Sequence, residues 1–140
     1  MKNKTLYLTI IIVSIIGLLI ASYLIYTHYQ QQIIFCDINS INSCHNVLNG
    51  PYSELFFNIP NSLIGALGFL LLGILGYLGL RNYKKEINKL LLIFSSISLI
   101  FILYLAYLIF FVIHSFCIYC FTTWILVIII FICSILLNKK

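Results

Sequence analysis

Hydrophobic residues occur along this chain in four long runs that polar residues interrupt at three places. The runs cover about residues 5–27, 62–80, 90–113 and 117–137. Each is close to the roughly 20 apolar residues that an α-helix needs to cross a bilayer. The pattern therefore predicts an all-α fold, an integral membrane four-helix bundle made as one domain from residues 1–140.

The segments between the runs differ in charge. Residues 28–61 form a long polar stretch without Lys or Arg, whereas residues 81–89 form a basic loop. Every Lys and Arg lies near the N-terminus, in the basic loop or at the C-terminus. Because these residues accumulate in cytoplasmic segments, the pattern predicts cytoplasmic termini, a cytoplasmic loop 81–89 and an outward-facing loop 28–61. Within the outer loop we expect a short interfacial helix around residues 47–57.

Composition supports a membrane protein and argues against nucleic-acid binding. The chain is 63% hydrophobic and 8% charged, whereas soluble domains carry about 25% charged residues. The net charge of +5 comes from a few basic residues. These residues flank the apolar runs, as expected beside a membrane. The lipid bilayer is therefore the expected partner, and nucleic acid is not.

The second apolar run contains five glycines at helical spacing. They are Gly65, Gly68, Gly73, Gly76 and Gly79. Small residues on one helix face let helix backbones approach closely in lipid. We expect these glycines to serve helix packing.

A Cys-x-x-Cys pair, Cys117 and Cys120, opens the fourth run. Both thiols are expected in the first helical turn and on one face, where free backbone N–H groups favour a thiolate. The same spacing also suits a zinc knuckle. Cys36 and Cys44 lie in the outer loop, so all four thiols are expected on the outer side, where disulfides persist. Two pairs within reach can pass two electrons by thiol–disulfide exchange.

The remaining cysteine and the histidines carry weaker signals. Cys133 lies 13 positions after Cys120, or roughly 20 Å along a helix, so we expect a buried and inert thiol. His28, His45 and His114 all fall on the outer side of the predicted topology. We interpret them as interfacial polar residues, with His45 as the best candidate for an exception, because it neighbours Cys44 and a nearby imidazolium lowers the pKa of a thiol.

Three other functions fit the sequence less well. Four cysteines can clamp zinc in a structural protein, but the seven residues between Cys36 and Cys44 exceed the usual spacing of two to four. A small four-span transporter usually needs a charged or histidine side chain inside the membrane, and the four runs contain no Asp, Glu, Lys, Arg or His. A different class of four-helix disulfide oxidase carries its Cys-x-x-Cys in the first outer loop, whereas here the pair opens the fourth helix.

Three segments carry a family resemblance. They are Cys36-Asp37 followed by Ser43-Cys44, then Asn61-Ser62-Leu63-Ile64-Gly65, and finally Phe116-Cys117-Ile118-Tyr119-Cys120-Phe121-Thr122-Thr123. With these segments in order, the chain resembles the vitamin K epoxide reductase family over nearly its whole length. Members are four-helix membrane oxidoreductases that couple thiol oxidation to reduction of a quinone or a quinone epoxide.

The resemblance implies a role for each of the four cysteines. Cys36 would exchange with an external thiol protein, and Cys44 would form a transient disulfide with Cys117. Cys120 would be the thiolate beside the quinone ring. Many bacterial relatives carry a fused thioredoxin-like domain; this chain ends at Lys140, so the expected partner is a separate thioredoxin-like protein on the outer side. The implied role is to support disulfide-bond formation.

The resemblance also implies the quinone contacts. Asn61 would hydrogen-bond a quinone carbonyl. Phe57 is a candidate for a different reason: the Phe56–Phe57 stretch lies shortly before Asn61 in the chain, and we expect it to close over the ring and exclude water. Trp124 stands where vertebrate members have a tyrosine; its indole donates one hydrogen bond but lacks a phenol. The expected electron acceptor is a quinone of the menaquinone, ubiquinone or vitamin K type, without a metal. The abundance of Ile, Asn and Lys favours a prokaryotic cell membrane over the endoplasmic reticulum.

Overall fold

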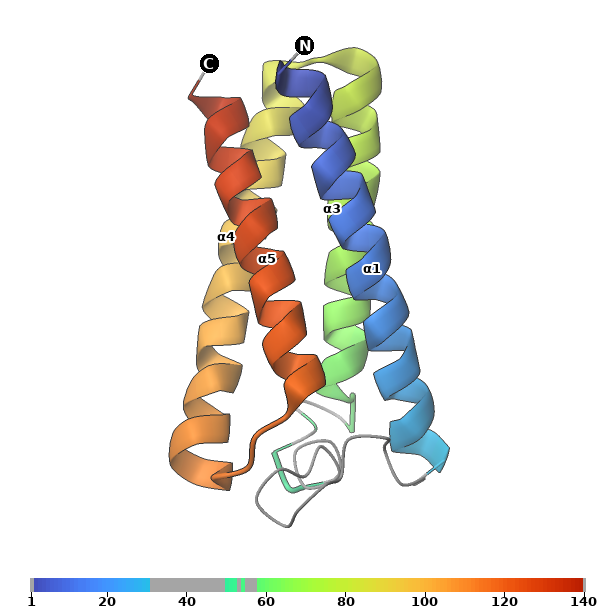
Figure 1. Ribbon diagram of the computed structural model, residues 1–140, viewed down its shortest axis with the longest axis vertical. Coiled ribbons are helices and arrows are strands. Elements are labelled where there is room, and N and C mark those ends of the chain that lie inside the picture. The colour runs from blue at the N-terminus through green and yellow to red at the C-terminus, as the bar shows by residue number, and fades with distance from the viewer. Residues whose placement is uncertain (1, 31–49, 53, 55–57, 140) are drawn as a thin grey trace.

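The structure is a computed structural model that describes residues 2–30, 50–52, 54 and 58–139. The helices in this part of the chain are α1 (Lys2–Gln30), α3 (Asn61–Asn82), α4 (Lys85–Tyr107), the π-helix η1 (Leu108–Ile113) and α5 (Ile118–Asn138). With η1 continuing α4, four helices are long and apolar enough to cross a membrane (Figure 1). The predicted all-α, four-helix membrane fold is confirmed.

The helices form a closed ring, α1–α3–α4–α5, in which each helix packs against its two neighbours (Figure 1). The most extensive contact joins α1 to α3, and the least extensive joins α3 to α4. Tyr7, Ile10, Leu72, Leu91 and Ile130 are buried along the axis. Each helix satisfies its backbone hydrogen bonds internally, as a lipid environment requires.

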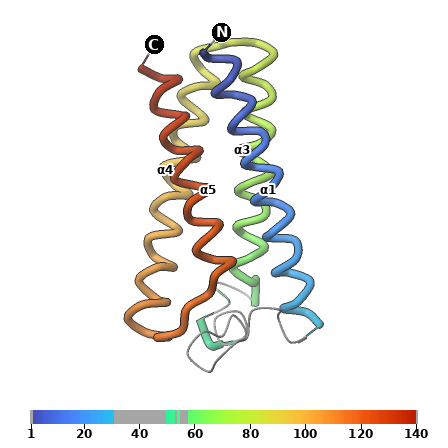
Figure 2. The backbone as a smooth tube through the Cα atoms, viewed as in Figure 1, coloured from blue at the N-terminus to red at the C-terminus, as the bar shows by residue number. Residues whose placement is uncertain are grey.

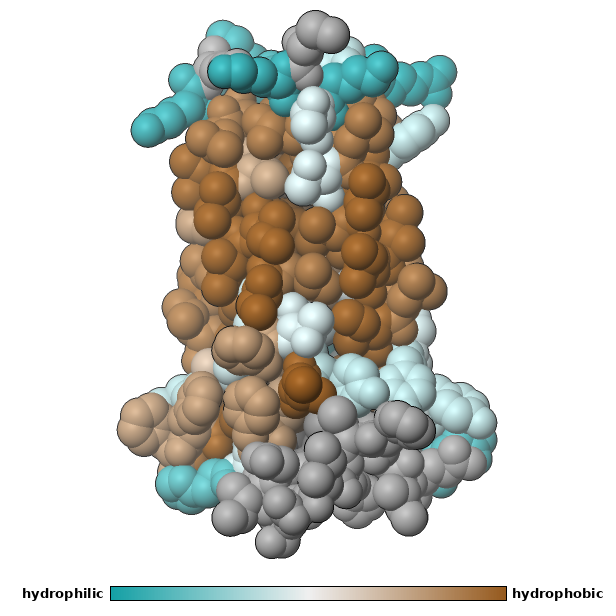
Figure 3. Space-filling model, in the orientation of Figure 1, coloured by the Kyte–Doolittle hydropathy of each residue, from teal (hydrophilic) through white to brown (hydrophobic). Residues whose placement is uncertain are grey.

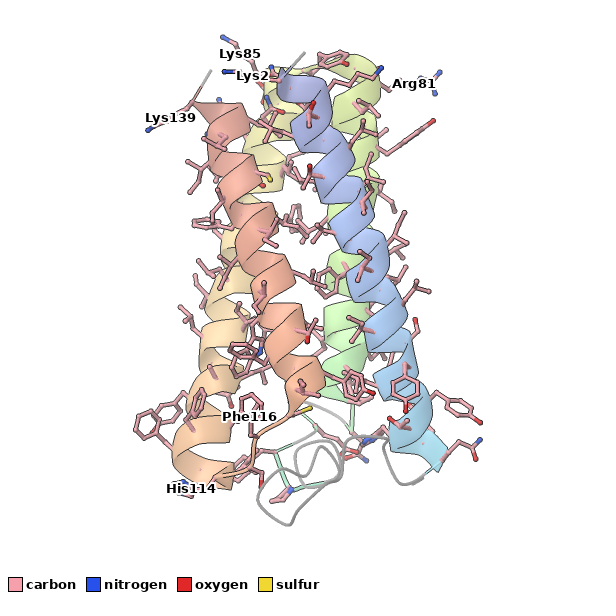
Figure 4. The ribbon with its side chains drawn as sticks, in the orientation of Figure 1. Lys2, Arg81, Lys85, His114, Phe116 and Lys139 are labelled. Atoms are coloured by element: carbon pink, nitrogen blue, oxygen red, sulfur yellow. The ribbon has the colours of Figure 1, made fainter. Side chains whose placement is uncertain are left out.

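The two ends of the bundle differ in chemistry. Lys2, Arg81, Lys85 and Lys139 surround one end, which we call the basic end, and both termini lie there (Figure 4). His114 and Phe116 mark the opposite end, which we call the thiol end because Cys117 follows them in the chain. The space-filling view shows a hydrophilic band at the basic end and a broad hydrophobic belt below it (Figure 3). The belt is the surface expected to face lipid.

Glycines on α3 allow the close approach of α1. A Cβ atom added to Gly76 would lie 3.0 Å from Cγ2 of Ile10, and one added to Gly79 would collide with the Tyr7 ring. A Cβ atom added to Gly73 would likewise come close to the Ser14 side chain. The predicted packing role is therefore confirmed for these three glycines.

A polar network joins three helices at the basic end. The Tyr7 hydroxyl donates to Oδ1 of Asn88, and Nδ2 of Asn88 donates to the Leu137 carbonyl at 3.4 Å. The Tyr83 ring packs edge-on against Tyr7, with centroids 5.9 Å apart. These contacts tie α1, α4 and α5 together where the apolar belt ends.

The thiol end is built from loops and helix termini. Residues 114–117 run without helical structure from η1 to α5 (Figure 2). Most of the interfacial helix predicted at residues 47–57 lies outside the described residues; Pro51 and Tyr52 form a turn. Glu54 makes an antiparallel bridge with Pro60, directly before α3. This bridge holds described loop residues against the entrance of α3.

Candidate functional site

The two thiols of the Cys-x-x-Cys pair occupy different positions at the start of α5. Cys117 is the N-cap residue in extended backbone, and its carbonyl accepts the Phe121 N–H at 3.0 Å. Cys120 lies in the first turn of the helix. The prediction that both thiols lie in the first turn is therefore wrong for Cys117, because the extended 114–117 segment continues through it.

Cys117 is the more deeply buried thiol. It is 2% exposed and forms a small cluster with Leu24 of α1, against which Cys120 also packs. Cys120 is half-buried and contacts the main core as well. The Cys-x-x-Cys pair therefore lies between α1 and the interior of the bundle.

A cavity of about 300 Å³ lies beside Cys120, and residues from all four helices line it. Its volume falls at the lower end of the range for small-molecule sites, about 300–1,000 Å³. Most of the lining is aliphatic or aromatic. The polar or titratable lining residues are His28, Tyr52, Asn61, Ser62, Ser98, Cys120, Thr123 and Trp124.

The lining polar groups differ in whether they already have hydrogen-bond partners. The Ser98 and Thr123 hydroxyls donate to carbonyls of their own helices, at 2.9 Å and 2.7 Å. By contrast, Oδ1 of Asn61 and Oγ of Ser62 are buried without a partner in the described part of the chain. An unmade hydrogen bond at a buried polar atom costs about 1–3 kcal/mol. These two atoms are therefore the ones available to a ligand.

Described loop residues contact the cavity at the thiol end of the bundle. Nδ2 of Asn61 donates to the Tyr52 carbonyl at 2.9 Å, and Tyr52 also lines the cavity. Glu54, fixed by its bridge to Pro60, lies 3.7 Å from Nε2 of His28. The end of α1 and the start of α3 are thereby joined over one cavity.

Some residues that line the cavity on α3 and α4 are also exposed on the surface of the bundle. Leu71 and Ile97 line it from these helices, yet 36% and 55% of their surfaces are exposed. This is also the helix pair with the least extensive contact. From these two observations we infer a lateral path between α3 and α4 by which a long apolar group bound in the cavity would reach the lipid.

Gly65 and Gly68 differ from the other glycines of α3. A Cβ atom added to Gly65 would meet nothing within 4 Å, and one added to Gly68 would meet only Oγ of Ser98, at 4.0 Å. Both residues line the cavity. The packing role expected for all five glycines is wrong for these two, because no neighbouring helix approaches α3 closely at either position.

The structure brings together some of the residues that the sequence singled out. Cys120, Asn61 and Trp124 line the cavity, and Trp124 is 9% exposed, with its ring 6.1 Å from that of Phe121. Cys133 is buried in the main core and is not part of the lining. Cys36, Cys44 and Phe57 lie outside the described residues.

Sequence reasoning missed Ser62 and His28 as cavity residues. His28 was expected in the outer loop, but α1 continues to Gln30 and presents His28 to the cavity with Ala21 and Leu24. Leu24 and His28 follow Ala21 by three and seven positions, and such positions share one face of a helix. This spacing was the available signal in the sequence. Because the residues after Thr27 are polar, the hydrophobic pattern did not indicate that the helix continues to Gln30.

Comparison with known proteins gives one family match. The sequence model of the Vitamin K epoxide reductase family matches residues 8–135 of the 140-residue chain. No curated protein matches the chain. The matched range covers the apolar helices and the polar segments whose residues line the cavity.

Proposed function

Because the chain belongs to the vitamin K epoxide reductase family, we propose that it carries electrons from a thioredoxin-like protein to a quinone. Members of this family are membrane thiol–disulfide oxidoreductases that use quinones and generally work with thioredoxin-like proteins. In this chain the reaction would support disulfide-bond formation outside the membrane. The acceptor is a quinone of the menaquinone, ubiquinone or vitamin K type.

The electrons follow two cysteine pairs. Cys36 exchanges with the partner's thiols, and Cys44 then forms a transient disulfide with Cys117. Attack by Cys36 on Cys44 resolves that disulfide, which leaves a Cys36–Cys44 disulfide and leaves Cys117 and Cys120 as thiols. Cys120 then supplies electrons at the cavity, and a disulfide between Cys117 and Cys120 remains. The burial of Cys117 supports this order, because its 2% exposure leaves it poorly accessible to a large partner.

The observation that carries the proposal is the cavity shared by Cys120, Asn61 and Trp124. It is apolar, begins at a redox-competent thiol and opens sideways between α3 and α4. A quinone has a flat ring with two polar oxygens and, in membranes, a long apolar tail. The ring fits beside Cys120 while the tail leaves through the lateral opening.

Asn61 is proposed to hold the polar edge of the ring. One of its N–H groups is engaged by the Tyr52 carbonyl, which fixes the orientation of the amide. The second N–H can donate to a quinone carbonyl. Oδ1, which has no partner among the described residues, can accept a hydroxyl hydrogen from the reduced product. One side chain can therefore bind both redox forms.

The direct test uses purified protein in lipid nanodiscs with a reduced thioredoxin-like protein and a quinone. Quinone should disappear one-for-one with oxidation of the partner's dithiol. The single tryptophan of the chain, Trp124, lines the cavity, so its fluorescence should be quenched when quinone binds. Dithiol oxidation without quinone consumption would overturn the proposal.

In that assay, Asn61→Ala should lower quinone turnover by roughly 10- to 100-fold, because a hydrogen bond of about 1.5–3 kcal/mol is lost. Exchange between the partner and the loop cysteines, measured without quinone, should stay nearly unchanged. Asn82→Ala, at the other end of α3, is the control. Loss of partner exchange with normal quinone kinetics would move the quinone site away from Asn61.

The proposed orientation places the basic end in the cytoplasm and the thiol end outside. The segregation of Lys and Arg supports it. A membrane-impermeant thiol reagent should therefore label Cys36 and Cys44 in intact cells after mild reduction. Labelling that occurs only in inverted vesicles would reverse the orientation.

A further inference from the structure

We propose that His28 and Glu54 form the proton path to the quinone, with His28 as the residue that exchanges protons with the substrate inside the cavity. The inference rests on the proposed function, because it concerns the same cavity. It assigns a catalytic residue that neither the thiol relay nor the quinone contacts include.

The position of His28 spans the boundary between the cavity and the outside. Its side chain is 13% exposed and lines the cavity, while Nε2 lies 3.7 Å from Oε1 of Glu54. The Glu54 side chain is 38% exposed, so it meets water. This contact thus joins a solvated carboxylate to an imidazole that borders the buried cavity.

His28 lines the same cavity as Cys120 and lies on the helix that contacts both thiols. Leu24 packs with Cys117 and Cys120, and His28 lies four positions further along α1. Four residues correspond to about 6 Å along a helix axis. A quinone ring seated beside Cys120 therefore lies within reach of the imidazole.

Quinone reduction needs protons as well as electrons, and the described lining offers few sources. The titratable lining residues are His28, Tyr52 and Cys120. Cys120 is used as the electron donor, and a phenol holds its proton firmly near neutral pH. Imidazole both gives and takes a proton in this range. A positioned acid of this kind typically accelerates a reaction by about 10²–10⁴-fold.

The step balances as follows. Two S–H bonds of Cys117 and Cys120 break and one S–S bond forms, while the quinone takes two electrons and gains two O–H bonds. The Cys120 proton passes to the imidazole, and the imidazolium protonates one quinone oxygen. The Cys117 proton leaves to water, and a second proton enters from water through Glu54 and His28 to the other oxygen. His28 and Glu54 end each turnover unchanged.

The test measures single-turnover oxidation of the pre-reduced protein by ubiquinone in nanodiscs. His28→Ala should slow quinone reduction by about 10²-fold, and millimolar imidazole should restore a large part of the rate. Glu54→Gln should slow it less, because water can still reach His28 slowly. Quenching of Trp124 by quinone and exchange with the partner should be unchanged in both variants.

His114→Ala is the matched control, since His114 is exposed at the same end of the bundle and does not line the cavity. It should keep the wild-type rate and show no response to imidazole. A His28→Ala rate equal to wild type, or a loss that imidazole leaves unrestored, would overturn the proposal. If His28→Ala does not fold, an unchanged rate in Glu54→Gln overturns the path. Failure of the wild-type protein to reduce quinone would instead refute the proposed function.

Discussion

Quinone reduction driven by a thioredoxin-like protein is expected to fall close to zero when Cys117 is replaced by alanine. In the proposed relay Cys117 receives the electrons from Cys44, so its loss leaves Cys120 without a reductant. Removal of a nucleophile from a covalent sequence typically costs at least about 10³-fold. The loop pair should remain reduced, which thiol trapping and mass spectrometry can measure. Quenching of Trp124 by quinone should persist, because Cys117 does not line the cavity.

Cys133→Ala is the control for this experiment. Cys133 lies on the same helix, is 7% exposed and belongs to the main core rather than the cavity. Its replacement should lower stability by about 1 kcal/mol, as an average core change does, and leave turnover near the wild-type value. Equal loss of activity in the two variants would show that the relay has been assigned to the wrong cysteines.

The second large effect is expected from Gly68→Leu, which should abolish quinone binding while the protein stays folded. The nearest atom to a Cβ added at Gly68 is Oγ of Ser98, 4.0 Å away across the cavity. A leucine side chain there occupies space in a cavity of about 300 Å³. Quenching of Trp124 by quinone should disappear, and turnover should fall by more than about 10²-fold if the ring is displaced from Cys120.

The matched variant on the same helix is Gly79→Ala. A Cβ atom there collides with the Tyr7 ring, which also holds Asn88 through its hydroxyl. Overpacking of this kind costs about 1–3 kcal/mol. Its midpoint of thermal unfolding should therefore fall, while quinone affinity remains normal. If Gly68→Leu melted earlier than Gly79→Ala and still bound quinone, the cavity would not be the quinone site.

The number of helices, their lipid-facing character and the separation of charge between the two ends were determined by the sequence alone. These properties are local. A run of apolar residues in a bilayer has to satisfy its own backbone hydrogen bonds as a helix, and Lys or Arg is excluded from the hydrocarbon region. The Cys-x-x-Cys spacing at the start of the fourth run is local in the same sense. The sequence alone therefore indicated a candidate site for thiol–disulfide chemistry.

The lining of the cavity was decided only by the tertiary structure. Gly68 and Gly76 share one helix and similar neighbours in the chain, yet Gly76 faces Ile10 of α1 and Gly68 faces the open side toward α4. Cys120 borders the cavity while Cys117 packs with Leu24, and His28 enters the cavity because α1 continues past the last apolar residues. Whether each of these residues borders the cavity depends on the side chains that a neighbouring helix places at the same depth in the bundle. The hydrophobic pattern of a single span carries no such information, since lipid and neighbouring helices are both apolar and favour the same residues.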